Sequence, residues 1–445
     1  MDTEAYFDRL WPICRSITGN GFRESLNILS EVVPFEVHEV PSGKEVFDWV
    51  VPDEWNITEA YIEDEEGNRL IDMADNNLHV VSYSLPVDDW FSFEALEPRL
   101  HVHASLPNAI PYQTSYYKPY WGFCLSQEQK SALFSAGKRY HVVIRSTLEP
   151  GSLTYGLCVL PATVETSAEI LVTSYLCHPS MANNELSGPL TLMNVYDRLS
   201  QLEERRFNYR FFIGPETIGT ITFLHEWGNH LKEHCVGGMV LSCCGYGKTI
   251  HYRQTWSDEH LMDRCVRNYE NQFNRAALES DKEKCHVKSL PFTPTGSDNR
   301  FYASPGFRIP VGSVVRNLYG VYPEYHTSLD NKSVIDFDDL HESADFVCEI
   351  FSEMEANAVY KTLFPFCEPQ LGKRNLYYEP CTQKTGPVTS FNHVNALLHL
   401  LYYGDGDFEL VDIAQKMGIS VKDLANLAKT LEEQEVLTST KRLYK

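Results

Sequence analysis

The order of apolar and polar residues divides this 445-residue chain into segments of distinct character. Three short runs, at 170–176, 209–213 and 309–315, are apolar and rich in β-forming residues, as are strands buried on both faces of an α/β sheet. Apolar residues recur with helical spacing after two of these runs, at 189–202 and 220–231. The pattern therefore predicts strand–loop–helix units and an α/β core.

The pattern changes ahead of these runs. From about 46 to 125 the chain is rich in Trp, Tyr and Pro, and alternation at 78–84 predicts a strand there. We therefore expect a small β-rich insertion at 46–125. The core domain is then expected to comprise residues 1–45 and 126–370.

The C-terminal part of the chain has a third pattern. Helical spacing at 391–402, 410–417 and 421–435 is followed by a β-rich run at 436–439. Helix, turn, helix and then strand is the order of a winged helix, so we expect a separate winged-helix domain over 385–445.

Composition narrows the class of protein. The net charge of −23 leaves few cations to contact phosphate, so we expect neither nucleic-acid nor anionic-membrane binding. No apolar run approaches the roughly 20 residues that cross a bilayer, and the acidic N-terminus lacks the features of a signal peptide. The 12 cysteines form no CxxC pair, which favours reduced thiols over a disulfide framework. We expect a cytoplasmic location.

Residues suited to metal binding or proton transfer follow each of the three predicted strands. His178 and Glu216 come just after the first two, and His326 lies in a loop that begins after the third. Ligands bind outside the carboxyl ends of strands in such sheets, so we expect these residues to converge. Two histidines and a glutamate compose a metal-assisted hydrolase site. Taken singly, each has an ordinary alternative: a structural histidine or, for Glu216, a helix cap.

Other polar residues nearby are candidates for substrate binding. Asp298 is a candidate to bind a substrate amine or supply a metal ligand, although such a residue also suits a turn or helix cap. Arg316 and Tyr319 are candidates to hold a substrate carboxylate, with a structural ion pair of Arg316 as the alternative. The aromatic cluster at 112–121 is expected to form a hydrophobic seam between insertion and core rather than to roof the pocket.

Three motifs resemble those of a known enzyme family. The segment 181–188, with sequence MANNELSG, resembles the loop of the co-catalytic zinc aminopeptidases in which a histidine precedes Asn-Asp-x-x-Ser-Gly. The ETIG segment at 216–219 resembles their Glu-Glu-x-Gly segment. The YHT segment at 325–327 resembles their final Tyr-His-Thr element.

Over nearly its full length the chain is similar to a bacterial family of aminopeptidase-like proteins with a C-terminal winged helix, often associated with polysaccharide biosynthesis. The resemblance implies a zinc-aminopeptidase-like mixed sheet flanked by helices. The motifs that carry it are CRSITG at 14–19, FDWVVP at 47–52, YY at 116–117, WGFC at 121–124, CHPS at 177–180, PEYHTS at 323–328 and PQLGKR at 369–374.

The chain departs from the two-metal pattern of the zinc aminopeptidases at three carboxylate positions. Their bridging aspartate is matched by Asn184, their second glutamate by Thr217, and a further aspartate by Tyr246. Neutral groups do not offset the repulsion between two neighbouring dications. The resemblance therefore implies at most one zinc ion in this chain.

The resemblance also implies a function. His178 and His326 would hold the ion, helped by Glu216 or the carbonyl of Asn184, and Glu216 would act as general base. The expected activity is amide hydrolysis on a small peptide or aminoacyl substrate. The alternative is a catalytically silent scaffold that binds a peptide, an amino sugar or a partner protein.

The predicted winged helix is net acidic, which bears on its role. It carries six Lys or Arg against eight Asp or Glu over residues 385–445. We therefore expect it to serve interaction or homo-oligomerisation rather than DNA binding.

Overall fold

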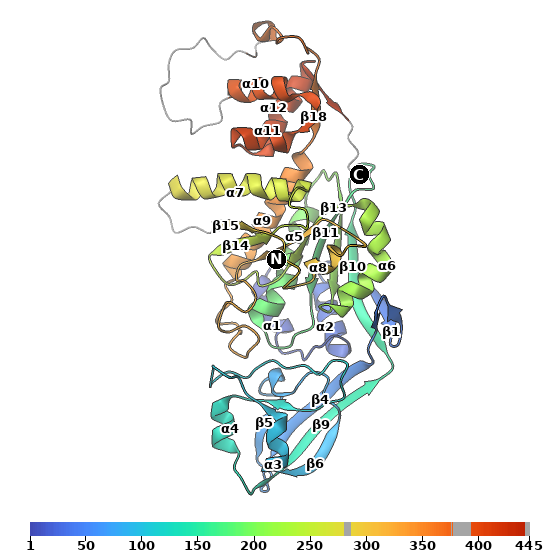
Figure 1. Ribbon diagram of the computed structural model, residues 1–445, viewed down its shortest axis with the longest axis vertical. Coiled ribbons are helices and arrows are strands. Elements are labelled where there is room, and N and C mark those ends of the chain that lie inside the picture. Colours follow the sequence, from blue (N-terminus) through green and yellow to red (C-terminus); the bar gives the residue numbers. More distant parts are fainter. Residues whose placement is uncertain (280–285, 375, 377–392, 441–445) are drawn as a thin grey trace.

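The computed structural model describes residues 1–279, 286–374, 376 and 393–440. They form three units stacked along the long axis of the molecule: a β-rich insertion at one end, an α/β core in the middle and a C-terminal unit at the other end (Figure 1). No helix among these residues combines the length and the apolar character that a bilayer crossing requires.

Eight strands form the centre of the core: β1 (Glu36–Pro41), β10 (Ser152–Leu160), β11 (Glu169–Tyr175), β12 (Asn208–Gly214), β13 (Cys235–Leu241), β14 (Thr249–Arg253), β15 (His286–Leu290) and β16 (Val311–Val315). They make one mixed sheet in the order β1-β10-β12-β11-β13-β16-β14-β15. β12, β11, β13 and β16 are parallel neighbours, so their carboxyl ends meet at one edge. All residues of β11 are buried, as its continuous apolar run predicts.

Helices cover both faces of this sheet, which confirms the expected fold class. They are α1 (Thr3–Leu10), α2 (Asn20–Leu29), α5 (Ser187–Ser200), α6 (Ile218–His234), α7 (Leu261–Glu279), α8 (Asn299–Tyr302) and α9 (Phe337–Ala356). α1, α2, α5, α7 and α9 share one hydrophobic cluster with the sheet, whereas α6 and α8 pack on the opposite face. α5 approaches the strands closely at Gly188, where a Cβ atom would collide with Ser174 and the carbonyl of Leu241.

The insertion has its own four-stranded sheet, made of β4 (Glu54–Glu63), β5 (Arg69–Asp72), β6 (Val87–Ser92) and β9 (Arg139–Glu149) in the order β5-β4-β9-β6. This sheet extends past the expected boundary at residue 125, because β9 pairs with both β4 and β6. The strand expected at 78–84 does not form. A 3₁₀ helix spans Asn77–His79 instead, and the ring of His79 hydrogen-bonds to the carbonyl of Cys124 at 2.8 Å.

The smaller elements of the insertion complete its outline. Two short strand pairs accompany the four-stranded sheet, β2 with β3 and β7 with β8. Two helices lie beside it in Figure 1. The bounds are β2 (Glu45–Val46), β3 (Trp49–Val50), β7 (Leu100–His101), β8 (Phe123–Cys124), α3 (Phe93–Leu96) and α4 (Gln127–Leu133).

The C-terminal unit is a winged helix, as the sequence predicts. It contains β17 (Val359–Thr362), α10 (His393–Tyr403), β18 (Asp405–Glu409), α11 (Leu410–Met417), α12 (Val421–Glu433) and β19 (Leu437–Thr440). β17 lies at the centre of its small sheet, so the unit begins well before the expected residue 385. The start of that expected range, 385–392, lies outside the described residues.

Arg23 on α2 joins the insertion to the core. Its guanidinium donates to Glu54 at the start of β4 at 2.6 Å and to Glu39 on β1 at 3.1 Å. The hydrogen bond from Arg23 lowers the pKa of Glu54 to about 2, although partial burial opposes this shift. The junction between the two units therefore depends on an ionised carboxylate.

We predict that acid weakens this junction. Because the folded-state pKa of Glu54 lies below its ordinary value of 4.5, the pair stabilises the fold above that pH and loses its contribution as the pH falls toward 2. Glu54→Gln should lower the free energy of unfolding by about 1–2 kcal/mol at neutral pH, measured by urea denaturation. The difference from the wild type should shrink steadily in acid, and a difference that does not change with pH would contradict the assignment.

Candidate metal centre

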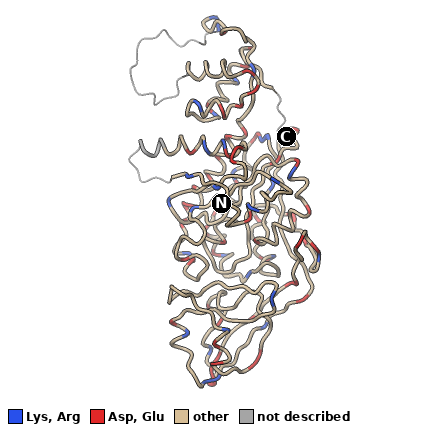
Figure 2. The backbone as a smooth tube through the Cα atoms, viewed as in Figure 1, with Lys and Arg blue, Asp and Glu red and all other residues tan. Residues whose placement is uncertain are grey.

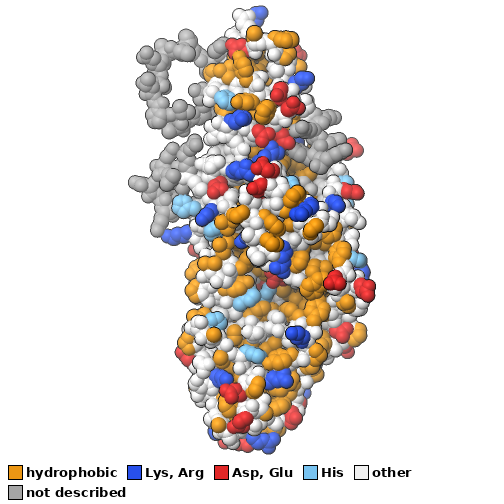
Figure 3. Space-filling model, viewed as in Figure 1, with side chains coloured by type: hydrophobic (Ala, Val, Ile, Leu, Met, Phe, Trp, Pro, Cys, Tyr) orange, Lys and Arg blue, Asp and Glu red, His pale blue; other side chains and the backbone are white. Residues whose placement is uncertain are grey.

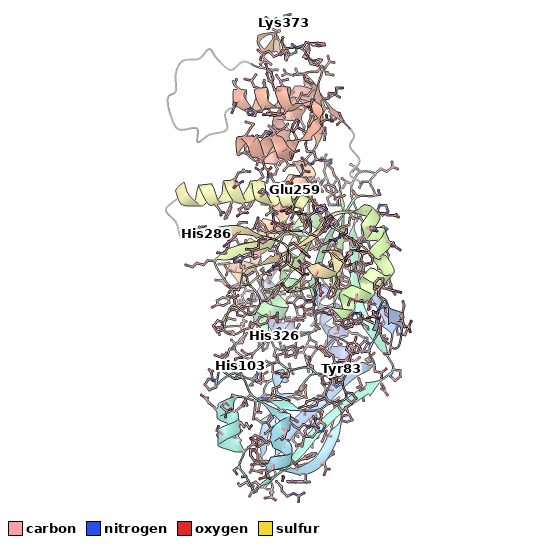
Figure 4. All side chains as sticks on the ribbon, viewed as in Figure 1. Tyr83, His103, Glu259, His286, His326 and Lys373 are labelled. Carbon is pink, nitrogen blue, oxygen red and sulfur yellow. The ribbon has the colours of Figure 1, made fainter. Side chains whose placement is uncertain are left out.

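The three residues predicted to converge do so at the carboxyl edge of the core sheet. His178 follows β11, Glu216 follows β12, and His326 lies in the loop after β16. Nε2 of His178 lies 3.8 Å from a carboxylate oxygen of Glu216, and the rings of His178 and His326 have centroids 5.4 Å apart. Figure 4 shows His326 where the core meets the insertion. The topology thus brings together side chains that are far apart in the sequence.

Glu185, which the sequence analysis did not select, sets the orientation of the His178 ring. Its fully buried carboxylate contacts Nδ1 of His178 at 2.7 Å and accepts a hydrogen bond from the backbone N–H of Cys177. A carboxylate can only accept, so Nδ1 carries a proton in either charge state of the ring, and Nε2 is the nitrogen available to a metal once its own proton is lost. A carboxylate behind a histidine in this way is a recurrent feature of metal sites.

A buried cation lies behind this pair. The guanidinium of Arg15 is almost fully buried and donates to the backbone carbonyl of His178 at 3.3 Å and to Ser25 Oγ at 3.0 Å. Burial lowers the pKa of Arg15, whereas the carboxylate of Glu185 favours the charged form. Arg15 and Glu185 therefore partly neutralise each other beneath the histidine.

The two histidines differ in their tendency to take up a proton. Burial opposes protonation of His178, but Cys177 and the carboxylate of Glu185 together raise its pKa well above the usual range. Burial and the neighbouring His178 lower the pKa of His326 to about 3. His326 is therefore a neutral imidazole at physiological pH, which is the form that binds metals.

Asp330 connects the loop after β11 to the loop of His326. Its carboxylate accepts the backbone N–H groups of Asn183 at 2.7 Å and Asn184 at 2.9 Å, and the hydroxyl of Tyr322 at 3.1 Å. Burial raises the pKa of Asp330 to about 6. The hydrogen bonds of the Asp330 carboxylate therefore hold these loops together.

Backbone strain is concentrated around the site. His326, Thr217, Ser180 and Cys243 all have positive φ angles, of 56°, 65°, 47° and 48°. Residues with side chains rarely adopt this region, and such outliers persist where the surroundings fix them, often at functional sites. The strained loops here carry the very residues that converge at the sheet edge.

The positions matched to the missing carboxylates hold neutral groups with other contacts. The amide of Asn184 donates to the hydroxyl of Tyr175 at 2.9 Å, and its own side-chain oxygen is buried without a hydrogen-bond partner. Thr217 precedes α6, and Tyr246 packs edge-on against Tyr322 with centroids 5.9 Å apart. Asn184 is not among the residues that line the cavity described below.

The three residues predicted to bind substrate have mainly structural contacts. The buried carboxylate of Asp298 accepts the N–H of Thr217 at 2.9 Å and the hydroxyl of Thr220 at 2.7 Å, so it stabilises the start of α6. Tyr319 pairs with Ser242 through their hydroxyls at 2.5 Å. Neither Asp298 nor Tyr319 lines the cavity.

Arg316 departs most clearly from its expected role. Its side chain is completely buried, forms an ion pair with Asp339 at 3.0 Å and a second one with Glu342, and does not line the cavity. We therefore interpret Arg316 as part of a structural ion pair and not as a group that holds a substrate carboxylate. This ion pair depends on the position of α9.

A cavity of about 450 Å³ opens over the converging residues, within the range of small-molecule sites. Tyr112 packs against both histidines, with its ring centroid 4.9 Å from that of His178 and 5.5 Å from that of His326. The tyrosines at 112, 116 and 117 form a wall of the cavity, and Tyr112 and Tyr116 also pack against buried hydrophobic clusters, so the aromatic residues act as wall and as seam. The lining residues are Ile17, Trp49, Tyr112, Gln113, Thr114, Tyr116, Tyr117, Cys177, His178, Glu216, Thr217, Ile218 and His326.

Potential ligand atoms within 4.8 Å of one another occur, among the described residues, in the group Cys177, His178 and Glu185. Hydrogen bonds already join these three side chains and backbones, and burial raises the pKa of Cys177 to about 11, although the neighbouring His178 opposes this shift. We therefore interpret the group as the orienting network of His178. The one signal for Glu185 in the sequence is an acidic residue in the polar loop that follows His178.

A family model with the description "Domain of unknown function (DUF4910)" matches residues 4–357, and one for a winged helix-turn-helix matches residues 358–439. The chain belongs to the DUF4910 family. A Clostridium acetobutylicum protein whose name refers to polysaccharide biosynthesis and an aminopeptidase-like domain is 40% identical over 434 residues, which cover 97% of this chain and 94% of the relative.

Solved structures support the same relationship. A crystal structure from Clostridium acetobutylicum, described as a peptidase, matches with a TM-score of 0.87 and 38% identity, covering 99% of this chain and 96% of that one. A zinc aminopeptidase from Bacillus subtilis matches with a TM-score of 0.55 and 10% identity, covering 79% and 95%. The second likeness concerns the fold alone. The DUF4910 core is thus an aminopeptidase-like fold.

We predict that Glu185 is essential to the stability of the core. Glu185→Leu removes the acceptor of the Cys177 N–H and the carboxylate that faces Arg15, and leaves a buried cation without its partner. The free energy of unfolding should fall by about 3–5 kcal/mol, measured by denaturant titration. Glu185→Gln keeps an acceptor and should cost clearly less; equal losses for both variants would contradict this role.

Proposed function

We propose that this DUF4910 protein is a metal-dependent amide hydrolase of aminopeptidase type that holds one zinc ion and acts on a small peptide-like or aminoacyl substrate. The observation that carries the proposal is the contact between Glu185 and Nδ1 of His178, which leaves Nε2 beside Glu216. A histidine held in this way is poised as a metal ligand.

The side-chain types at the cavity suit a single zinc ion, and the ion would have to draw them closer, because the ligand atoms of His178, Glu216 and His326 do not all lie within 4.8 Å of one another. Among the described residues, no hydrogen bond occupies Nε2 of His178 or either ring nitrogen of His326. With Glu216 these two imidazoles make a His₂Glu donor set, a composition that recurs in catalytic zinc sites with an open position for water. Asn184 does not line the cavity, so the proposal leaves it out of the donor set.

Among the described residues at the sheet edge, a second ion lacks suitable carboxylate ligands. The matched positions Asn184, Thr217 and Tyr246 provide no carboxylate, and Asp298 and Asp330 use their oxygens on backbone and hydroxyl donors. A bridging anion would be needed to hold two dications a few ångströms apart. The proposal is therefore restricted to one ion.

The chemistry follows from these residues. A bound zinc ion would supply a Lewis acid and lower the pKa of a water molecule. Glu216 faces His178 with one oxygen, and its other oxygen accepts from Ser297 Oγ at 3.3 Å. Glu216 is also the carboxylate that reaches the cavity to accept a proton. Because one carboxylate must serve as ligand and as base, we expect slow turnover.

The winged helix is proposed to serve protein interaction, including contact with a second copy of the chain, rather than DNA binding. The first residue of α12, Val421, is buried and donates its N–H to Glu353 of the core at 2.7 Å. A recognition helix reads DNA with its N-terminal residues, and here that end is covered. Figure 2 shows acidic residues among the basic ones in this unit, and Figure 3 shows both signs across the visible face. A cytoplasmic location is likewise proposed.

We predict one zinc equivalent per chain. Metal-depleted protein, reconstituted with excess zinc and desalted, should retain one equivalent in elemental analysis. His178→Ala and His326→Ala should each lose it, because two ligands hold zinc poorly. His230→Ala on the outer helix α6 is the matched control and should retain it. Two tightly held equivalents would show that ligands outside the proposed set exist.

We also predict zinc-dependent amide hydrolysis. Reconstituted protein should release amine from a panel of aminoacyl amides, and metal-free protein should not. Glu216→Gln should reduce kcat/KM by about 10²-fold or more. Glu226→Gln, whose carboxylate pairs with Lys44 outside the cavity, is the control and should leave the rate unchanged. Stoichiometric zinc with no turnover on any amide would favour the silent scaffold instead.

A further inference from the structure

One wall of the cavity consists of aromatic side chains, which extend outward from the histidines. Tyr112 lies against both histidines, and its hydroxyl bonds to that of Tyr116 at 3.0 Å. Farther out, Tyr117 meets Trp49 edge to face with centroids 5.9 Å apart. Trp49 comes from β3 and the tyrosines come from the insertion. These rings line the cavity from the two histidines out to exposed positions.

The outer two rings are exposed yet held in place. Trp49 is 40% exposed and Tyr117 is 51% exposed. Tyr117 has a φ of 62° and donates its hydroxyl to the carbonyl of Val50 at 3.2 Å, which ties the insertion loop to the hairpin. Large exposed rings in a strained, hydrogen-bonded position indicate a binding platform rather than a packing element.

The charge of the cavity limits what the platform can bind. None of the described residues that line it is Lys or Arg, and its carboxylate is that of Glu216. Beside the rings lie uncharged polar side chains, those of Gln113, Thr114 and Thr217. A phosphate, carboxylate or nucleotide would therefore lack a cationic partner here.

An open aromatic platform with polar neighbours matches the chemistry of a sugar ring. A pyranose has apolar C–H faces that stack on Trp and Tyr, and hydroxyl edges that bond to amides and hydroxyls. An aliphatic amino-acid side chain is better matched by an enclosed apolar pocket. The arrangement on Trp49 and Tyr117 is open to solvent at the rim.

We propose that Trp49 and Tyr117 form a subsite for an uncharged hexosamine residue, so that the scissile amide joins an acyl or aminoacyl group to the sugar nitrogen. Hydrolysis would break the C–N bond, form a C–O bond from water to the carbonyl carbon, and release a carboxylic acid and the amino sugar, with the proton of water passing to the nitrogen. This substrate class rests on the proposed function.

A larger cleft of about 570 Å³, lined in part by Ser180 of the loop after His178, suits such a ligand less well. Charged side chains that already pair with one another line it, including Arg69 with Asp72 at 2.7 Å and with Glu59 at 2.7 Å. Its ring from Trp11 is not accompanied by a second aromatic side chain among the lining residues described. The aromatic wall is therefore the stronger candidate.

The test measures binding in metal-free protein, so that it does not depend on catalysis. Di-N-acetylchitobiose is titrated by calorimetry and by saturation-transfer NMR, against N-acetylphenylalanine amide and the anionic N-acetylneuraminic acid. We expect the chitobiose to bind most tightly. Trp49→Ala and Tyr117→Ala should each weaken it about tenfold. Trp90→Ala, which removes a ring that is 38% exposed and stacks on His141 away from the cavity, is the control and should not change it.

The outcomes separate the two proposals. Chitobiose that does not bind, binds both variants as tightly as the wild type, or binds more weakly than the phenylalanine amide overturns the sugar subsite. If zinc-loaded protein then still cleaves aminoacyl amides, the proposed function stands without it. Conversely, ring-dependent binding of chitobiose by a protein that cleaves neither N-acyl amino sugars nor aminoacyl amides supports the subsite and overturns the hydrolase.

Discussion

The contact between the Glu185 carboxylate and Nδ1 of His178 is the interaction on which the site depends. It holds the imidazole at the end of β11, determines which nitrogen is free, and places a buried anion opposite the buried cation of Arg15. Glu185 lies on a π-helical turn at Ala182–Leu186, which turns its carboxylate toward the strand end while the amide of Asn184 contacts Tyr175. π-helical turns are rare and recur at functional sites. The local backbone thus decides which side chain of the loop serves the histidine.

The insertion contributes backbone contacts and aromatic side chains to the site. Pro111 pairs with Thr327 as an isolated bridge, and the N–H of Tyr112 donates to the carbonyl of His326 at 2.9 Å. His326 is strained and lies on a loop, so this added pairing helps to fix its position. The same contacts therefore position both the aromatic wall and His326. Substrate recognition and metal binding are therefore coupled through a few backbone contacts.

The sequence predicted the parts of this structure that depend on long-range apolar pattern and strand topology. β11, β12 and β16, with the convergence of His178, Glu216 and His326, follow from buried runs and from the rule that strand ends carry sites. The role of Glu185 was not predictable in this way, because it depends on the π-helical turn at Ala182–Leu186, which the apolar pattern does not specify. The ion pairs of Arg316 depend on the docking of α9, which periodicity does not specify. The sequence did not indicate that β9 belongs to the insertion, because β4, a strand with which it pairs, lies many residues earlier in the chain.

The most direct test of the account is anomalous scattering at the zinc edge from crystals of the zinc-reconstituted protein. The account predicts one peak, at about 2 Å from Nε2 of His178 and from a ring nitrogen of His326, with a carboxylate oxygen of Glu216 as third ligand. Glu185 should remain on Nδ1 of His178 and outside the coordination sphere. Two peaks at the sheet edge, or one peak bonded to Cys177 and Glu185, would contradict it.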